Sequence, residues 1–145
     1  MSKIYHIIII SVLLLLFLSC GTTKHFGKIF TTSEADQLFG KVIFSKEIPA
    51  ETVISLLNRT EINIMFGLIN REIVILDNNR KLIYPEKAEI NDNDIFTVYS
   101  ISVLKELLSN GSSQIVNVEQ RREVLSVSYG NNTMETGTKC PPICD

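Results

Sequence analysis

The feature that most constrains this chain is an apolar segment, Ile7–Leu18, which is interrupted only by Ser11 and is soon followed by the polar sequence GTTKHFGK. Lys3 gives the segment a basic start, and Cys20 stands at its end. A helix that spans a bilayer needs about 20 apolar residues, so this run is too short to span one comfortably. Its length and its flanks are typical of a secretory signal. We therefore predict that the chain is exported and that residues 1–19 are the signal.

The residues around Cys20 resemble those of the bacterial lipoproteins, and the match rests on Leu18, Ser19, Cys20 and Gly21. The resemblance implies that a signal peptidase cuts before Cys20, whose sulfur and new amino group are then acylated, with palmitate among the acyl chains. The class usually has Leu where this chain has Phe17. In that class Asp after the cysteine often marks retention at the inner membrane, so Gly21 implies the outer membrane. Without lipidation, the same signal would yield a periplasmic or secreted protein.

The resemblance covers the export segment alone, and the remaining residues resemble no family. We predict a lipidated, polar tether at 20–32 and a single domain at 33–145. His25 lies in this tether and is expected to be solvated, with a metal ligand as the alternative. The chain has a formal net charge of −2 and no cluster of basic residues, which argues against a nucleic-acid partner. The expected partners are the membrane, through the lipid on Cys20, and another envelope protein.

The first half of the domain contains signals for two helices and four strands. Ser33, answered by Asp36, is a candidate N-cap for a helix that ends at Gly40. A second helix is expected from Pro49 onward, because Ala50, Val53, Ile54 and Leu57 recur at helical spacing. Runs rich in β-branched, aromatic and other apolar residues predict strands at 41–46, 62–69, 72–76 and 81–84, the last three forming a meander. Strand 62–69 is apolar on both faces and is therefore expected to be central.

The second half begins with a polar, acidic loop at 86–94, interpreted as a solvated turn with an oxygen-lined cation site as the alternative. A strand at 95–99 and a helix from Ser100 or Ser102 to Asn110 follow. Strands at 114–120 and 123–129 form a hairpin, and 133–138 is a weak edge strand. Arg121 and Arg122 lie at the hairpin tip, where they are expected to be solvated, although an anion site is the alternative.

Strands outnumber helices and do not alternate with them as a parallel sheet requires, and the sequence shows no internal repeat. The predicted fold class is therefore α+β, an antiparallel sheet of meander and C-terminal hairpin with about three short helices packed on it.

The sharpest feature of the domain is its C-terminal sequence, Cys140-Pro-Pro-Ile-Cys144. With Cys20 acylated, two cysteines remain, and an even pair in an exported domain is most simply a disulfide. A redox-active dithiol and a soft-metal pair, for example for Cu(I), are the alternatives.

Few signals for catalysis are present. The only histidine outside the signal is His25, so a Ser–His hydrolase has no base in the predicted domain. Phosphate-binding and dinucleotide-binding glycine motifs are absent, and no cofactor or catalytic residue is predicted. The favoured function is a non-enzymatic binding or structural module of the cell envelope. A thiol or soft-metal protein that uses Cys140 and Cys144 is the first alternative, and a carboxylate-based hydrolase is the second.

Overall fold

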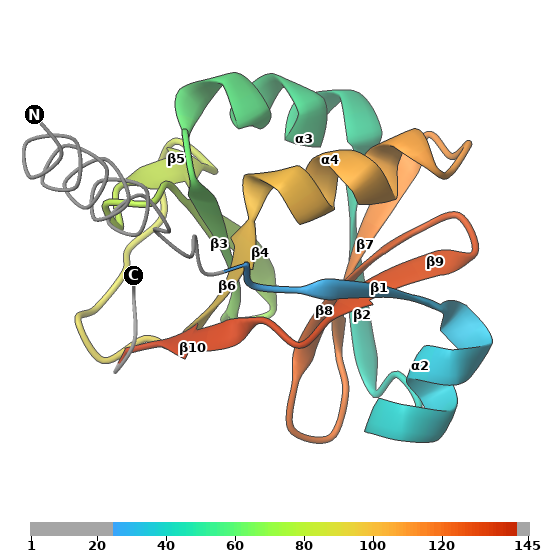
Figure 1. Ribbon diagram of the computed structural model, residues 1–145. Helices are drawn as coiled ribbons and strands as arrows, with labels where there is room; N and C mark the ends of the chain where they lie inside the picture. Colours follow the sequence, from blue (N-terminus) through green and yellow to red (C-terminus); the bar gives the residue numbers. More distant parts are fainter. Residues whose placement is uncertain (1–24, 142–145) are drawn as a thin grey trace, which may run out of the picture.

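The computed structural model describes residues 25–141 of the chain. These residues form an α+β fold in which two antiparallel sheets lie below a pair of helices (Figure 1), so the predicted fold class is confirmed. Sheet A has the strand order β1 (Lys28–Thr31), β9 (Asn132–Glu135), β8 (Leu125–Tyr129), β7 (Ile115–Gln120) and β2 (Phe44–Pro49). Sheet B has the order β10 (Thr138–Cys140), β6 (Phe96–Ser100), β3 (Asn63–Ile69), β4 (Glu72–Leu76) and β5 (Leu82–Tyr84).

Three helices accompany the sheets within the described residues: α2 (Thr32–Phe39), α3 (Ala50–Leu56), which continues into the 3₁₀ turn η1 (Leu57–Arg59), and α4 (Ile101–Ser109). The first helix begins earlier than the sequence predicted. Its N-cap is Thr31, whose hydroxyl accepts from the backbone N–H of Glu34 while the Glu34 carboxylate accepts from the Thr31 N–H. This capping box satisfies two backbone donors, so Thr31 and Glu34 replace the predicted pair of Ser33 and Asp36.

Residues 28–31 of the predicted tether belong to the fold. They form β1, which pairs with β9 from Lys28 opposite Glu135 to Thr31 opposite Asn132. Strand β9 is consequently an inner strand of sheet A, although the sequence analysis predicted a weak edge strand there. The predicted strand at 41–46 is also displaced, because the ladder with β7 runs from Phe44 to Pro49. The prediction that 62–69 is central is confirmed by the place of β3 in sheet B.

The same order of elements, a strand, a helix and a three-strand meander, occurs twice in the chain. The first unit is β2-α3-β3-β4-β5, and the second is β6-α4-β7-β8-β9. The leading strand of each unit joins the meander of the other, since β2 pairs with β7 and β6 pairs with β3. The junctions match, because the Ala50 N–H donates to Gln114 O (2.8 Å) and the Ile101 N–H donates to Ile62 O (3.0 Å). The two units are therefore interlocked.

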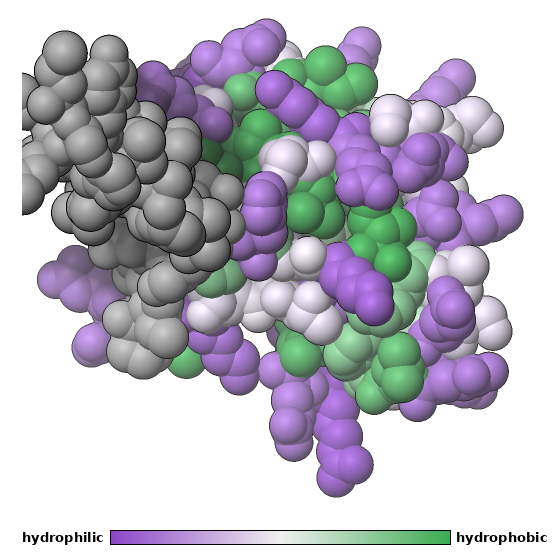
Figure 2. Space-filling model, in the orientation of Figure 1, coloured by the Kyte–Doolittle hydropathy of each residue, from purple (hydrophilic) through white to green (hydrophobic). Residues whose placement is uncertain are grey.

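The main core lies between the two sheets and the helices α3 and α4. Each helix contributes its apolar stripe, with Val53 and Leu104 completely buried. Ile54, which the sequence analysis placed in the stripe of α3, is half exposed, and Leu56 is buried instead. On the face of the molecule in Figure 2, hydrophobic residues reach the surface over and between these helices and are surrounded by hydrophilic ones.

A second, smaller core covers the outer face of sheet B. It contains six buried residues, Met65, Val74, Leu76, Phe96, Val98 and Cys140. Phe26 and the apolar side chains of Ala88 and Ile90 pack against it. The loop at 86–94, predicted to be a solvated turn, therefore covers apolar surface in part. The loop also surrounds a cation, because Nη2 of Arg80 donates to the carbonyl oxygens of Asn91, Asp92 and Asp94 at 2.9–3.2 Å.

Tyr99 connects the two sheets through the main core. It belongs to β6, is completely buried, and donates its hydroxyl to Leu125 O at 2.6 Å, with Met134 O at 3.3 Å. Both acceptors belong to sheet A. Burial, and to a smaller degree the nearby Glu135, raises the pKa of Tyr99 well above its usual value, so this hydroxyl stays protonated and remains a donor.

We expect Tyr99→Phe to lower the free energy of unfolding by about 1–3 kcal/mol, because buried carbonyl oxygens would lose their donor. Urea denaturation followed by circular dichroism would measure the change. Tyr84→Phe is the matched control, since the Tyr84 hydroxyl forms no side-chain hydrogen bond with the described residues, and it should change the value by no more than about 0.5 kcal/mol. Equal effects of the two substitutions would contradict the role given to Tyr99.

Candidate functional site

The outer face of sheet A is polar and buried, unlike the apolar outer face of sheet B. The two meanders can be compared position by position, because each begins opposite the last residue of the leading strand of the other unit. Strand β3 begins opposite Ser100 at the end of β6, and β7 begins opposite Pro49 at the end of β2. The pair Met65–Leu76 in sheet B then corresponds to Asn117–Ser128 in sheet A, and Gly67–Val74 corresponds to Glu119–Ser126. Where sheet B carries an apolar core, sheet A carries a network of hydrogen bonds and ion pairs.

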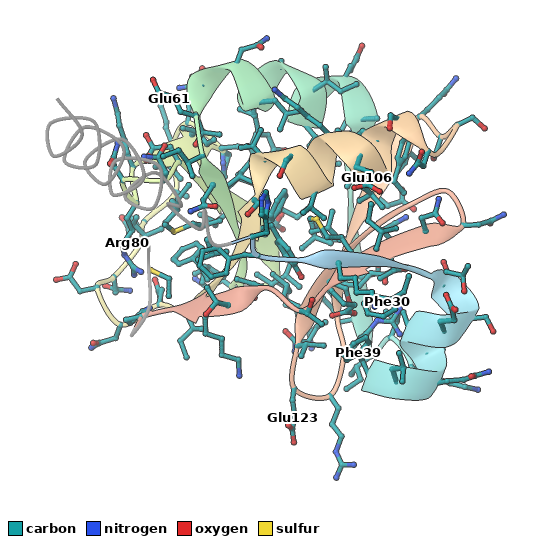
Figure 3. The ribbon with its side chains drawn as sticks, viewed as in Figure 1. Phe30, Phe39, Glu61, Arg80, Glu106 and Glu123 are labelled. Carbon is teal, nitrogen blue, oxygen red and sulfur yellow. The ribbon has the colours of Figure 1, made fainter. Side chains whose placement is uncertain are left out.

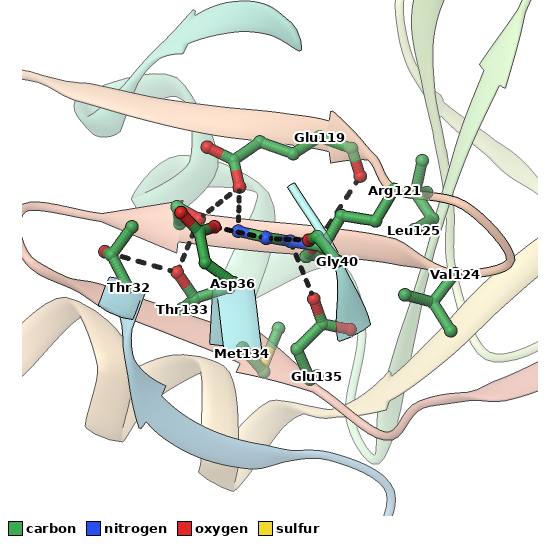
Figure 4. A network of polar contacts seen from close by, with 12 residues as sticks. Thr32, Asp36, Gly40, Glu119, Arg121, Val124, Leu125, Thr133, Met134 and Glu135 are labelled. Carbon is green, nitrogen blue, oxygen red and sulfur yellow. Dashed lines mark hydrogen bonds and ion pairs between the residues drawn. The ribbon is translucent and has the colours of Figure 1, made fainter. Parts of the chain in front are cut away.

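The centre of this network is Arg121, which is completely buried (Figure 4). Its Nη1 donates to Asp36 Oδ1 at 2.6 Å and to the carbonyl oxygen of Gly40, which ends α2. Its Nη2 donates to Glu119 Oε2 at 3.2 Å. The prediction that Arg121 is solvated at a hairpin tip was therefore wrong. The alternative prediction was an anion site, and the anions that Arg121 contacts in the structure are carboxylates of the protein itself.

The remaining nitrogen of Arg121 faces β8 and β9. Nε donates to Ser126 Oγ at 3.0 Å and lies 3.2 Å from Glu135 Oε1. The network continues from Glu119 through Ser128, whose hydroxyl donates to Glu119 Oε2 at 2.8 Å, to Thr133 at 2.9 Å. Since a guanidinium carries five N–H donors in a planar fork, one residue joins α2, β7, β8 and β9.

Glu135 is a member of this network whose pKa is shifted from its usual value. Its side chain is completely buried, and neither carboxylate oxygen accepts a well-formed hydrogen bond from any described residue. Burial raises its pKa above the usual value of 4.5. The Ser126 hydroxyl and the Arg121 guanidinium oppose this rise, and the charge of Glu119 adds to it. A buried carboxyl group with a raised pKa is a frequent feature of functional sites, and here it adjoins a backbone irregularity, since Thr136 has φ 60°.

Two open grooves lie at corresponding junctions of strand and helix. The larger, about 580 Å³, lies where β2 enters α3 and is lined by Pro49, Ala50, Glu51, Ile54, Ser113, Gln114, Ile115 and Tyr129. The other, about 370 Å³, lies where β6 enters α4 and is lined in part by His25. The chain itself borders this second groove, because the Phe26 N–H donates to Ser100 Oγ and the Ser100 N–H donates to Phe26 O. Of these two grooves, the one at α3 is lined by none of the first described residues of the chain.

The sequence-predicted site residues fall partly outside the described part of the chain. Cys20, predicted to be lipidated, and Cys144 lie outside residues 25–141, so the lipid anchor and the pairing of Cys140 with Cys144 stay predictions. Cys140 is buried at the end of β10, with Nη1 of Arg80 3.3 Å from its Sγ. His25 lies against the start of α4, 3.4 Å from Ser102 Oγ, rather than in an isolated tether.

Among residues 25–141 no group of three or more His, Cys, Asp or Glu side chains is placed to hold a metal ion, and no helix there is long and apolar enough to cross a bilayer.

The sequence analysis missed Glu119 and Glu135, because a carboxylate in an edge or hairpin strand ordinarily faces water. In the sequence, the only signal for these two residues was the alternation of polar residues with valines and other apolar residues.

Comparisons of the chain with family models, with curated proteins and with solved structures found no match. The function is therefore inferred from the residues of this chain alone.

We expect Arg121→Met to lower the free energy of unfolding by about 3–5 kcal/mol at neutral pH, because it leaves buried carboxylates without their cation. The neighbouring Arg122 is exposed, so Arg122→Met is a matched control with an expected effect within about 0.5 kcal/mol. Urea denaturation of both variants would test this. If Arg121→Met were as stable as Arg122→Met, the network would not hold sheet A together.

Glu135 also predicts a pH dependence. Because its pKa is raised in the folded state, the folded protein keeps a proton that the unfolded chain releases once the pH rises above about 4.5. The free energy of unfolding should therefore fall as the pH rises from 4.5 to the raised pKa.

Glu135→Gln cannot titrate and should lack this part of the fall. Urea denaturation at several pH values between 4 and 8 would compare it with the wild type. The control is Glu123→Gln, since Glu123 projects from the turn between β7 and β8 (Figure 3) and is exposed. Curves for Glu135→Gln that run parallel to those of the wild type would contradict the assignment.

Proposed function

We propose that this chain is an exported lipoprotein of the cell envelope, anchored by a lipid on Cys20, and that its α+β domain is a binding module. The observation that carries the proposal is the apolar segment Ile7–Leu18, which is followed directly by Ser19, Cys20 and Gly21. A single acyl chain gives only marginal membrane binding, whereas two or more chains, each adding about 0.8 kcal/mol per buried CH₂, give stable anchoring. The outer membrane is the proposed location, because Gly21 rather than Asp follows Cys20.

The arrangement of the domain supports a binding role. The start of β1 and strand β10 lie toward one side in Figure 1, and the junction of β2 with α3 lies toward the other. The open groove of about 580 Å³ is at that junction. A lipid at Cys20 would therefore hold the domain with this groove directed away from the anchored end. The groove combines exposed apolar side chains, Ile54 and Ile115, with polar ones such as Gln114, which is the usual composition of a ligand or protein contact site.

Substitution of Cys20 by Ala tests the anchor. We expect the wild-type chain to incorporate labelled palmitate and to fractionate with the outer membrane until detergent releases it. The Cys20→Ala variant should incorporate no palmitate and should leave the outer-membrane fraction, because the acyl chains that provide the binding energy are missing.

The matched control is Cys144→Ala, which removes another cysteine and leaves the proposed acylation site intact. It should behave like the wild type in both labelling and fractionation. Palmitate incorporation that persists in Cys20→Ala, or that is absent from the wild type, would exclude the proposed anchor.

A further inference from the structure

A small cavity lies where the turn between β7 and β8 meets the crossing from β9 to β10. Its volume is about 20 Å³, and its lining residues are Thr97, Val124, Leu125, Glu135, Thr136, Gly137 and Lys139. A cavity of this size accommodates one group as large as a water molecule. The chain is tightly constrained around it, because Thr136 has φ 60° and a side chain at Gly137 would approach the Thr97 methyl carbon to 2.5 Å.

The carboxylate of Glu135 has capacity for a further partner beside this cavity. Oε1 lies 3.2 Å from Arg121 Nε, and Oε2 has no hydrogen-bond partner among residues 25–141, although both oxygens are buried. Figure 4 shows the second oxygen of Glu135 turned away from the guanidinium, on the side of Val124, which also lines the cavity. A buried carboxylate oxygen without a donor is costly, so the position favours a ligand that donates.

The network contains more carboxylates than cations, and this excess favours a cationic ligand. Arg121 is the only cation in the network and forms ion pairs with three carboxylates, those of Asp36, Glu119 and Glu135. Asp36 is partly exposed and water can screen its charge, but Glu119 and Glu135 are buried. Lys139 lines the cavity but is exposed and forms no ion pair with any described residue. When Glu135 is ionised, a second positive charge beside it would balance the buried part of the network.

A groove lined by both aliphatic and polar side chains leads to the cavity. The groove has a volume of about 170 Å³ and shares four lining residues with the cavity, Thr97, Val124, Leu125 and Lys139. Its other lining residues are Leu68, Ile95, Gln120 and Glu123. Leu68 of sheet B and Leu125 of sheet A give it aliphatic surface from both sheets, beside polar neighbours. A slender alkyl chain fits such a groove, as the methylene stem of a lysine does on apolar protein surfaces.

We propose that this cavity and groove form a binding site for a primary alkylammonium group, with the –NH₃⁺ against Glu135 and the alkyl chain between the two sheets. An ammonium is a compact point charge with three donors, which suits a single carboxylate oxygen in a cavity of this size. A quaternary ammonium has four carbon substituents and is too large. This site is separate from the open groove at α3, and the inference rests on the binding role proposed for the domain.

The test is a titration of the full, detergent-solubilised chain with n-butylammonium chloride, followed by the amide NMR signals of Thr136 and Gly137. We expect saturable shifts with butylammonium and none with tetramethylammonium chloride or 1-butanol. The affinity should fall about tenfold per pH unit once the pH is below the pKa of Glu135, because protons then compete for the same oxygen. A short lysine peptide distinguishes the source: tighter binding of the peptide than of butylammonium indicates a protein partner, and the reverse indicates a free amine.

Two variants locate the site. Glu135→Gln should weaken butylammonium binding about thirtyfold or more, since it removes the buried half of a charge pair. Glu106→Gln, which changes an exposed carboxylate on α4 that lines neither the cavity nor the groove (Figure 3), should bind as the wild type does. If Glu135→Gln does not fold, the pH dependence and the comparison with tetramethylammonium in the wild type decide.

Three results would overturn the proposal: no saturable shift, equal shifts with tetramethylammonium, or equal binding by the two variants. A single bound water in the cavity would give the first of these. None of these results depends on membrane fractionation, so failure of the ammonium site is distinct from failure of the lipid anchor.

Discussion

The buried guanidinium of Arg121 is the group on which the organisation of sheet A depends. It contacts the end of α2 through Asp36 and Gly40, and it contacts β7, β8 and β9 through Glu119, Ser126 and Glu135. Burying a charge is costly unless ion pairs and hydrogen bonds replace its hydration, and an arginine provides enough donors to do this for several elements at once. Such a centre specifies one arrangement of α2 on the sheet, because a displaced helix would leave buried charges unpaired.

The contrast between the outer faces of the two sheets follows from the duplicated topology. Corresponding positions carry Val74 and Leu76 in sheet B but Ser126 and Ser128 in sheet A. An apolar face is covered satisfactorily by any apolar side chains, and in sheet B these come from a loop and from Phe26. A polar face under a helix requires matched donors and acceptors at fixed places. The two interlocked units thus share a backbone plan while burying different chemistry.

The sequence predicted the parts of the fold that local patterns specify. The apolar run of β3, the turn at Asn70 and Arg71, and the helix before Asn110 all lie close to their predicted places, because hydrophobic periodicity and turn residues determine them locally. The place of β1 beside β9 depends on contacts about a hundred residues apart along the chain, and the division into two sheets depends on other distant pairings such as β2 with β7. No local pattern encodes such contacts.

The candidate site was hidden from sequence analysis for a related reason. In β7 and β8 the residues Asn117, Glu119, Ser126 and Ser128 alternate with apolar ones, which is the pattern of strands with one face in water. The structure buries that face because α2, more than eighty residues away from Arg121 in sequence, lies over it.

The charge balance of the network links this structural centre to the proposed binding role. In a purely structural network, every buried carboxylate would be expected to be neutralised by a partner. The apolar core of sheet B has no charges and so has no such requirement. Here the Arg121 guanidinium is shared among three carboxylates. The least satisfied of them, Glu135, adjoins a cavity that shares lining residues with a groove of aliphatic and polar side chains between the sheets. Loss of a proton from Glu135 leaves a negative charge that a cation from outside can pair with. The residue that limits the stability of sheet A as the pH rises is therefore also the residue best placed to recognise a ligand.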